Sequence, residues 1–311
     1  MSVDDEPHHR FFAALQDKKL SYTFRAKMNV SVHYAFKKLF GNNENKDITK
    51  RFLSLILNIK ESDIKELIFK NPFVGGNYLD EKQGIIDIKL ELNQNIINIE
   101  MQNFWHSNYE ERVLFGWSNS YTEELTKGHN YGELKKCISI NIINSKFPYS
   151  DDIHSIYKIL NIKDKSSFKD LLELHFLDLT KLNHSIESLN ELERWLLFIQ
   201  TEENEIRENV SKGDKAMEKA DIVMKEFYSD PKERMLYTAI FMDECEKTTL
   251  FEQGKTEGIA IGKSEGRNEG MANIVLFMNK KGMTIDEINN NTGIDKEVIL
   301  SFIEQEKNIV S

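Results

Sequence analysis

The chain has 311 residues, 40% of them hydrophobic and 30% charged, with a formal net charge of −10. This composition is typical of a soluble globular protein with one or two domains and excludes a fibrous or wholly disordered chain. The acidic balance excludes a basic surface over the whole molecule, but residues 1–60 hold 11 Lys or Arg and 6 Asp or Glu, so a polyanion could dock on this N-terminal part.

Nothing in the sequence indicates a membrane protein or an exported one. No apolar run approaches the ~18 residues of a membrane span, and the N-terminus lacks the charged-then-apolar pattern of a signal peptide. The two cysteines, Cys137 and Cys245, lie far apart without CxxC spacing, which argues against a disulfide framework or a structural zinc site. We therefore expect a cytoplasmic protein that has no membrane partner.

Two helices are expected to open the folded part, after an N-terminal extension of residues 1–30. Apolar residues recur at helical spacing over residues 34–40 and 48–57, and the sequence GNNEN between them indicates a turn. An extended segment is expected around residues 68–74. These elements begin a core domain that we assign to residues 31–150.

A β-hairpin, a helix and a buried strand complete this predicted core. Residues 85–92 and 96–102 alternate isoleucine-rich and polar positions around the turn Asn93-Gln94-Asn95. Helical periodicity follows over residues 109–125, and the apolar run CISINII at 137–143 predicts a buried strand. The order of elements is that of an α/β fold.

The rest of the chain is expected to be mainly helical. Residues 151–250 are interpreted as an acidic helical extension whose helices include LLELHFLDL and ELERWLLFIQ. Residues 251–271 carry a glycine at every fourth position, from Gly254 to Gly270. Such spacing puts the glycines along one side of a helix and favours a self-associating helix, although a flexible charged linker remains the alternative.

The last segment, residues 272–311, has the outline of a helix-turn-helix. Thr284 with Glu287 makes a capping box, Gly293 marks a turn, and Asp295 is suited to cap the final helix. That final helix carries few basic residues, which makes it poor material for a DNA groove. A small packing or assembly module is therefore favoured, and DNA binding by this tail stays open.

The predicted hairpin carries acidic residues on one face. If its loop has two residues, Asn93 and Gln94, then Asp87 lies directly opposite Glu100 and shares a face with Lys89 and Gln102. Two opposed carboxylates destabilise a sheet unless a cation offsets their repulsion, and Mg²⁺ accepts such oxygen ligands. The alternatives are a solvated polar face, or a three-residue loop that shifts the pairing by one residue.

Three segments, in chain order, carry a family resemblance: VHYAFKKLFG at 32–41, IIDIKLELNQNIINIEMQ at 85–102 and ERVLFGWSNSYTEELTKGHNYGELKKCISINII at 111–143. Their most specific feature is an Asp, twelve intervening residues and Glu-x-Gln. A second pattern supports it, formed by Arg112, Tyr121, Leu125, Gly128 and Tyr131. In these motifs the chain resembles the recombination-promoting nuclease (Rpn) or putative transposase family of the PD-(D/E)XK nuclease superfamily.

The resemblance implies a restriction-endonuclease-like αβββαβ core with a mixed sheet, followed by a mainly helical C-terminal part. It also implies a metal-dependent DNA endonuclease linked to recombination, mobile elements or phage defence. Asp87 and Glu100 would bind Mg²⁺ or Mn²⁺ with the backbone carbonyl of Met101, and the metal would activate a water for attack on the scissile phosphate. Gln102 would orient that water. The candidates for contacts with DNA phosphates are Lys37, Lys38, Lys89 and Arg112.

One position departs from the family pattern. The family usually has an Asp at the start of its D-x-x-FK motif, whereas this chain has His33 in VHYAFK. Histidine is a weaker ligand for Mg²⁺, so it could take part in metal binding, shift the metal preference or abolish catalysis. The alternative function is therefore a catalytically inactive nuclease-fold protein that binds DNA or assembles through a self-associating helical tail.

Overall fold

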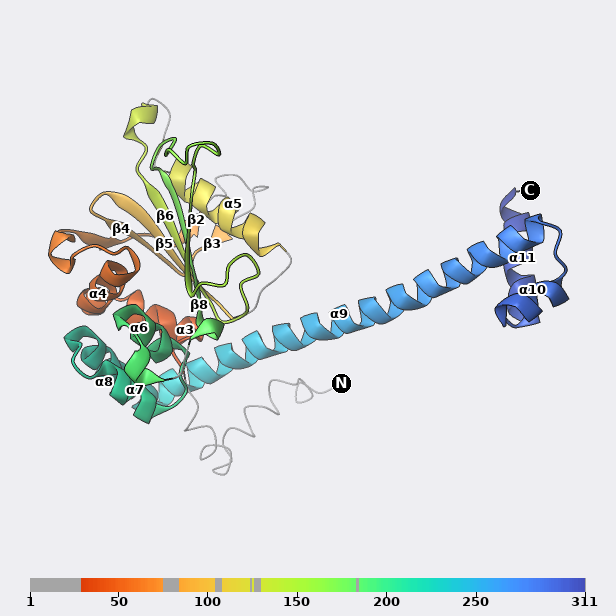
Figure 1. Cartoon of the computed structure of the whole chain (residues 1–311). Helices are drawn as coiled ribbons and strands as arrows, with labels where there is room; N and C mark the ends of the chain where they lie inside the picture. Colours follow the sequence, from red (N-terminus) through yellow and green to blue (C-terminus); the bar gives the residue numbers. More distant parts are fainter. Residues whose placement is uncertain are drawn as a thin grey trace, which may run out of the picture. The chain divides into compact units, whose positions relative to one another are not determined.

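The computed structural model describes residues 29–74, 84–103, 108–123, 125, 130–182 and 185–310. Two compact units divide the chain, Met1–Met242 and Asp243–Ser311, and Figure 1 shows the elements of each. The long helix α9, Pro231–Lys280, begins in the first unit and ends in the second. Among the helices of these described segments, none is long and apolar enough to cross a membrane.

The first unit opens with the two predicted helices, α3 (His33–Phe40) and α4 (Lys46–Ile56). Asn42 caps the turn between them, because its side-chain oxygen accepts a hydrogen bond from the N–H of Glu44. Thr49 Oγ1 donates to the carbonyl of Phe40 at 2.8 Å, which fixes the end of α3 against α4. The prediction of two helices joined by a turn at the start of the core is confirmed.

A mixed six-stranded sheet forms the centre of this unit, in the order β1-β4-β5-β6-β8-β7. β4 pairs antiparallel with β1 on one side and with β5 on the other. β6 pairs parallel with β5 and with β8, and β7 pairs antiparallel with β8 at the edge. A second small sheet joins β2 and β3. The strands are β1 (Leu67–Phe69), β2 (Phe73–Val74), β3 (Gly84–Ile85), β4 (Ile88–Leu92), β5 (Asn95–Gln102), β6 (Cys137–Ile143), β7 (His154–Lys158) and β8 (Leu172–Asp178).

The β4–β5 hairpin has the predicted two-residue turn. Ile88 pairs with Ile99 and Leu92 with Asn95, while Asn93 and Gln94 take φ values of 48° and 70°. Positive φ at both turn positions gives the backbone twist that suits a tight hairpin, and Asn tolerates this conformation better than most residues. The Asn93 side chain also accepts hydrogen bonds from two backbone N–H groups of the preceding segment.

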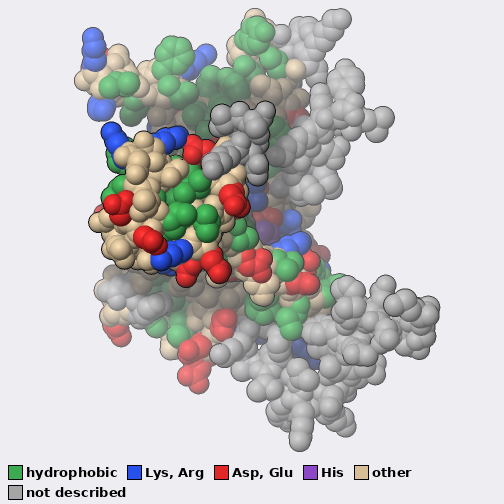
Figure 2. Space-filling model, turned by 90° about the vertical axis from the view of Figure 1, so that its right-hand side faces the viewer, with side chains coloured by type: hydrophobic (Ala, Val, Ile, Leu, Met, Phe, Trp, Pro, Cys, Tyr) green, Lys and Arg blue, Asp and Glu red, His purple; other side chains and the backbone are tan. Residues whose placement is uncertain are grey.

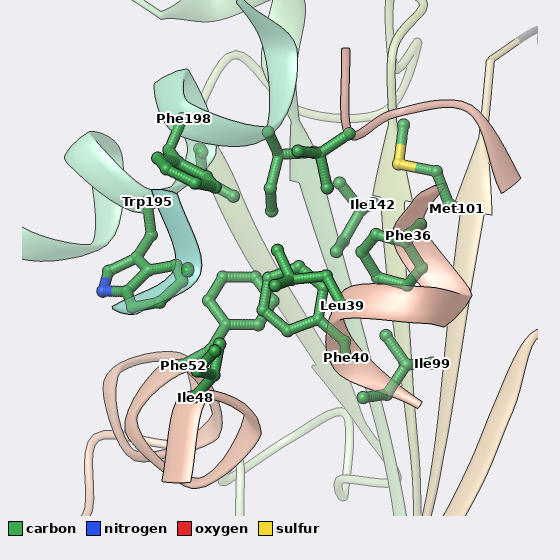
Figure 3. Packing of buried hydrophobic residues seen from close by; sticks show 14 of the residues in the cluster. Phe36, Leu39, Phe40, Ile48, Phe52, Ile99, Met101, Ile142, Trp195 and Phe198 are labelled. Carbon is green, nitrogen blue, oxygen red and sulfur yellow. The ribbon is translucent and has the colours of Figure 1, made fainter. Parts of the chain in front are cut away.

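Helices α3 and α4 pack on one face of the sheet together with α6 (Glu191–Gln200), α7 (Asn204–Ser211) and α8 (Lys215–Ser229) (Figures 1 and 3). In this core Phe40, Phe52 and Trp195 form an aromatic cluster with ring centroids 4.9 to 6.0 Å apart. Each of these side chains is fully buried, and truncation of such a residue to alanine costs about 3–5 kcal/mol. The rigid core thus fixes α3 against the end of the hairpin.

Helix α5, Tyr109–Thr122, covers the opposite face of the sheet. Tyr109 and Val113 pack there against Phe147 and Phe176, and the indole N–H of Trp117 donates to the carbonyl of Cys137 at 2.9 Å. Polar side chains of the hairpin therefore lie beneath a helix, not in solvent.

The interpretation of residues 151–250 as helical is wrong in its first part. LLELHFLDL contains strand β8, which lies parallel to β6, and β7 precedes it as an antiparallel edge strand. The charged residues Glu173 and His175 suggested an exposed helix face, but both are buried in the sheet and bonded to each other at 2.7 Å. A polar residue with a buried partner breaks the hydrophobic pattern without breaking the strand.

From residue 191 the helical expectation is confirmed. The helices are α6 (Glu191–Gln200), α7 (Asn204–Ser211) and α8 (Lys215–Ser229). Asp214 joins them to α4, because it caps α8 through the N–H of Ala216 and accepts from Arg51 Nε at 2.9 Å. The same carboxylate accepts from the indole of Trp195 at 3.2 Å.

The second unit has its own small core, built by the end of α9 with α10 (Ile285–Thr292) and α11 (Lys296–Val310). Its buried residues are Val275, Ile288, Ile299 and Ile303. The predicted capping box of Thr284 with Glu287 is present, and Gly293 ends α10 with φ of 71°, a conformation that favours glycine. The predicted helices of the tail are therefore confirmed, with the first continuous with α9.

Candidate active site

Asp87 lies one residue before strand β4, at the point where the hairpin meets α3. Its Oδ2 accepts a hydrogen bond from the backbone N–H of Met101 at 2.9 Å, and its side chain is only 6% exposed. Met101 follows Glu100 in β5, so this bond ties Asp87 to the strand that carries the second acid. The predicted proximity of the two acids follows from the hairpin register.

The two carboxyl groups differ in their charge state because of their surroundings. Burial raises the pKa of Glu100 to about 8, and the negative charge of Asp87 adds to the increase. Burial would also raise the pKa of Asp87, but the hydrogen bond and charge of His33, with Lys37 and the Met101 N–H, lower it overall. The pair therefore holds a proton at neutral pH that a bound cation would displace.

Helix α3 contributes two groups to the same oxygen. His33 Nδ1 lies 3.3 Å and Lys37 Nζ 3.1 Å from Asp87 Oδ1. They are four residues apart and so lie on one side of α3, while Phe36 and Phe40 of the same helix point into the core (Figure 3). Both side chains remain more than a third exposed, so they border the site at the solvent side.

Arg112 of α5 borders the site from the other side. Its Nη2 donates to Gln102 Oε1 at 2.7 Å and lies 4.0 Å from Glu100 Oε2. The guanidinium also lies over the ring of Tyr109, 5.4 Å from its centroid. The sequence analysis assigned Arg112 the role of a phosphate contact and missed its bond to Gln102. The position of Arg112 in the first turn of α5, the helix that follows β5, could have indicated that it lies near the end of that strand.

Two of the predicted phosphate contacts have partners elsewhere. Lys89 is 5% exposed and forms an ion pair with Glu123, which lies just after α5. Lys38 Nζ lies 2.9 Å from Glu233 Oε1, a carboxylate that also accepts from the hydroxyl of Tyr34. Burial removes Lys89 from the surface that DNA can reach, whereas Lys37 and Arg112 remain beside the acids.

The polar face of the hairpin is buried, which excludes the solvated face considered from the sequence. Asn98 and Gln102 are 2% and 6% exposed, and Asn98 Nδ2 donates to Ser120 of α5 at 2.9 Å. Glu91 pairs with Lys70 at 2.9 Å and Lys135 at 3.1 Å. Glu91 is thus neutralised by two lysines and Asn98 is hydrogen-bonded within the chain. Glu100 lacks a comparable pair of cations at short distance.

The donor set at Asp87 and Glu100 fits a hard divalent cation. Two carboxylates are sufficient protein ligands for Mg²⁺, which retains several waters, and a cation would offset the burial of Glu100 and the repulsion from Asp87 that together raise its pKa. Over the described part of the chain, no group of three or more His, Cys, Asp and Glu side chains is arranged to hold an ion. The protein thus supplies two acids and leaves the other positions to oxygen from water or substrate.

Comparison with known proteins identifies the family of the chain. The family model described as PD-(D/E)XK nuclease family transposase matches residues 31–246, more than half of the chain. No curated protein and no solved structure matches the chain. The matched region contains α3, the acidic hairpin and α5, which together build the site. The chain belongs to the PD-(D/E)XK nuclease family of transposases.

Proposed function

We propose that the protein is a metal-dependent DNA endonuclease with its site at the end of the β4–β5 hairpin. One observation carries the proposal: Asp87 and Glu100 lie together with side chains only 6% and 18% exposed, and burial, with the negative charge of Asp87, raises the pKa of Glu100 to about 8. Two largely buried acids that repel each other are unfavourable for folding, and such a pair with a strongly shifted pKa is typical of a functional site. The family membership supports a nuclease activity.

In this proposal Asp87 and Glu100 hold Mg²⁺ or Mn²⁺, with the carbonyl of Met101 as a further ligand. The ion supplies Lewis acidity at the scissile phosphate and activates water at neutral pH. Gln102 orients the attacking water, and Arg112 fixes the Gln102 amide through their 2.7 Å bond. Since Gln102 brings no charge, Lys37 and Arg112 stabilise the negative charge that develops on the phosphate.

Plasmid nicking in the presence of Mg²⁺ or Mn²⁺ tests this function. Asp87→Ala and Glu100→Ala each remove a metal ligand, and we expect each to lower the nicking rate at least about 100-fold. Glu91→Gln is the matched control, because Glu91 lies on the same hairpin face but is paired with Lys70 and Lys135. Nicking that persists in both alanine variants would place the active site elsewhere.

The second candidate function is DNA binding without cleavage. It is favoured by His33, whose Nδ1 lies 3.3 Å from Asp87 Oδ1. The resemblance implies a carboxylate at this position in the family. In that case the wild-type protein would shift DNA in a gel without cutting it under either metal. His33→Asp would then restore cutting, whereas a catalytically active wild type rules this candidate out.

We also propose that the protein forms homo-oligomers through α9. Residues 246–270 of this helix are exposed except for Thr248, and apart from the neighbouring residues and backbone of the helix itself, no described atom lies within 4 Å of a Cβ built at any of its five glycines. Each glycine costs an isolated helix about 1 kcal/mol relative to alanine. A covering partner would offset this cost, because glycines allow the backbones of two helices to approach closely.

The charges beside these glycines favour a parallel pair of copies. Basic residues follow the glycines on one side (Lys255, Lys263, Arg267), and acidic residues precede them on the other (Glu257, Glu265, Glu269). Like charges four residues apart are unfavourable within one helix. In a parallel twofold pair joined by the glycine sides, each basic row meets the acidic row of the second copy, whereas an antiparallel pair joins like charges.

Sedimentation of the full chain measures this association. We expect Lys263→Glu with Arg267→Glu to weaken it, and mixing with a Glu265→Lys, Glu269→Lys protein to recover it. Gly254→Cys in a Cys245→Ser background distinguishes the orientations, since residue 254 meets its own copy only in a parallel pair. A monomer at all concentrations would refute the proposal.

The cysteines bear on the compartment and the C-terminal lysines bear on the role of the tail. Cys137 and Cys245 are both free thiols, as expected for a protein of the reducing cytoplasm, which is the compartment we propose. Lys296 of α11 pairs with Asp286 at 2.5 Å and Lys280 with Glu306 at 2.6 Å. With these two lysines paired, the end of the second unit is better suited to assembly than to DNA. Figure 2 shows hydrophobic side chains in the middle of its visible face with charged ones around them.

A further inference from the structure

A hairpin arm extends from the edge of the six-stranded sheet. We give this name to residues 156–169, which run from the second half of β7 to the residues before β8 and are all exposed. A bridge between Leu160 and Ser167 holds the two sides of the arm together. At its base Leu172 pairs with Cys137, the first residue of β6, so the arm continues beyond the end of β6.

The arm is basic although it lies in an acidic part of the chain. Residues 151–250 hold 14 Lys or Arg and 22 Asp or Glu, whereas the arm holds four lysines and one acid. That acid, Asp164, accepts hydrogen bonds from the N–H and the hydroxyl of Ser166 and so shapes the turn. Lys158 pairs with Glu173 at 2.9 Å. Within the described residues the other three lysines have no ion-pair partner: Lys163, Lys165 and Lys169.

Large apolar side chains are exposed beside these lysines. Phe168 is 85% exposed and Ile162 is 87% exposed. The N–H of Phe168 donates to the carbonyl of Ile159 at 3.3 Å, which fixes the backbone of Phe168 next to Lys169. Lys165 takes a φ of 61°, a conformation that favours Gly or Asn, so the chain keeps a lysine at the turn at a cost to the backbone. An exposed aromatic ring among lysines suits an unpaired nucleic-acid strand, because bases stack on the ring and phosphates bind the ammonium groups.

We propose that the hairpin arm binds single-stranded DNA, with Lys163, Lys165 and Lys169 on the phosphates and Phe168 stacked on a base. The inference rests on the proposed function in taking DNA as the polyanion, and it adds a binding surface outside the site of cleavage. A second copy of the chain fits the arm poorly, because its own arm carries the same positive charge. Duplex DNA fits less well than a single strand, since paired and stacked bases offer no face to Phe168.

The arm and the two acids lie toward opposite ends of parallel strands. Glu100 of β5 is level with Asn141 of β6, and Asn141 is level with Phe176 of β8. From Phe176 back to Phe168 the chain covers about 25 Å of strand. The arm therefore holds DNA without touching the reacting phosphate, so we expect its substitution to raise the KM of nicking and to leave kcat unchanged.

The test measures binding of a labelled single strand of about 20 nucleotides to the full chain by fluorescence anisotropy, with chelator present so that no DNA is cut. Lys163→Gln, Lys165→Gln and Lys169→Gln together should raise the Kd at least about tenfold. They should also lower the slope of log Kd against log salt concentration by about 2, since three phosphate contacts are lost. Phe168→Ala should raise the Kd at least about fivefold with the slope unchanged. All four side chains are exposed, so the variants should keep the melting temperature of the wild type.

A matched set of lysines controls for net charge. Lys212→Gln, Lys215→Gln and Lys232→Gln together remove the same charge from exposed positions of the helical part, and this variant should bind the strand like the wild type. Arm variants with the Kd of this control, or arm variants that lose binding to phosphatidylserine vesicles but not to DNA, would overturn this inference alone. A protein that cuts no DNA but loses strand binding in the arm variants would refute the proposed cleavage and support this inference.

Discussion

Two glutamates of the same sheet lie in opposite electrostatic surroundings. Glu173 of β8 is surrounded by hydrogen-bond donors, with Lys136 Nζ at 2.5 Å, Lys158 Nζ at 2.9 Å and His175 Nε2 at 2.7 Å. The hydrogen bond from His175, with those from the two lysines, holds the pKa of Glu173 well below its usual range. Glu100 of β5 instead has its pKa raised to about 8 by burial and by the negative charge of the neighbouring Asp87.

The difference distinguishes Glu173, which stabilises the fold, from Glu100, which we propose binds a cation. At Glu173 the chain supplies the compensating charge itself, so the carboxylate contributes to folding. Among the residues that the structure describes, the positive group paired with Glu100 is Arg112, whose Nη2 lies 4.0 Å away and donates to Gln102. The compensation is therefore incomplete, and the fold retains an unfavourable pair that a cation stabilises.

The largest expected effect comes from neutralising the structural acid. Glu173→Gln leaves the buried His175 and two lysines without their common acceptor, and we expect the free energy of unfolding to fall by about 1–3 kcal/mol. Because the folded-state pKa of Glu173 lies below its unfolded value, this loss should be the same at pH 6 and pH 9. Urea denaturation measures it, and an unchanged stability would mean that the cations are satisfied by water.

The same substitution at the other glutamate should have the opposite sign. Folding raises the pKa of Glu100 from 4.5 to about 8, so the folded state binds the extra proton and its stability falls as pH rises through this window. Glu100→Gln removes that penalty. We expect it to gain about 1 kcal/mol over the wild type at pH 9 and little at pH 5, in metal-free buffer with chelator. A loss at pH 9 would contradict the unfavourable pair.

These two acids also show what the sequence could predict. Asp87 and Glu100 were found because the hairpin register follows from alternation and loop length, and Ile88 does pair with Ile99. Strand β8 was missed because Glu173 and His175 resemble exposed positions until their partners are known. Those partners, Lys136 and His154, are 37 and 21 residues away from Glu173 and His175 in the chain and come together only through the sheet. The burial of the polar hairpin face likewise depends on how α5 packs over the sheet, which the sequence pattern does not show.

Metal binding should convert the unfavourable pair into a stabilising one. A cation binds the ionised form of Glu100, so its affinity increases as pH rises toward and past about 8. We expect the increase in melting temperature on adding Mn²⁺ to be larger at pH 8.5 than at pH 6.5, by a few degrees. Glu100→Gln should show a small increase at both values, whereas Glu173→Gln should keep the pH dependence of the wild type.

The smallest effect concerns the acid side of the Glu173 cluster. Burial lowers the pKa of His154 to about 4, and the neighbouring His175, 2.8 Å away, adds to the decrease. The unfolded chain therefore binds a proton near pH 6.5 that the folded chain does not, so His154 destabilises the protein as pH falls from 6.5 toward 4. His154→Asn should flatten this decline by about 0.5–1 kcal/mol between pH 6.5 and 5. An identical decline in both proteins would show that His154 is protonated in the folded state, with Glu173 close enough to accept its charge.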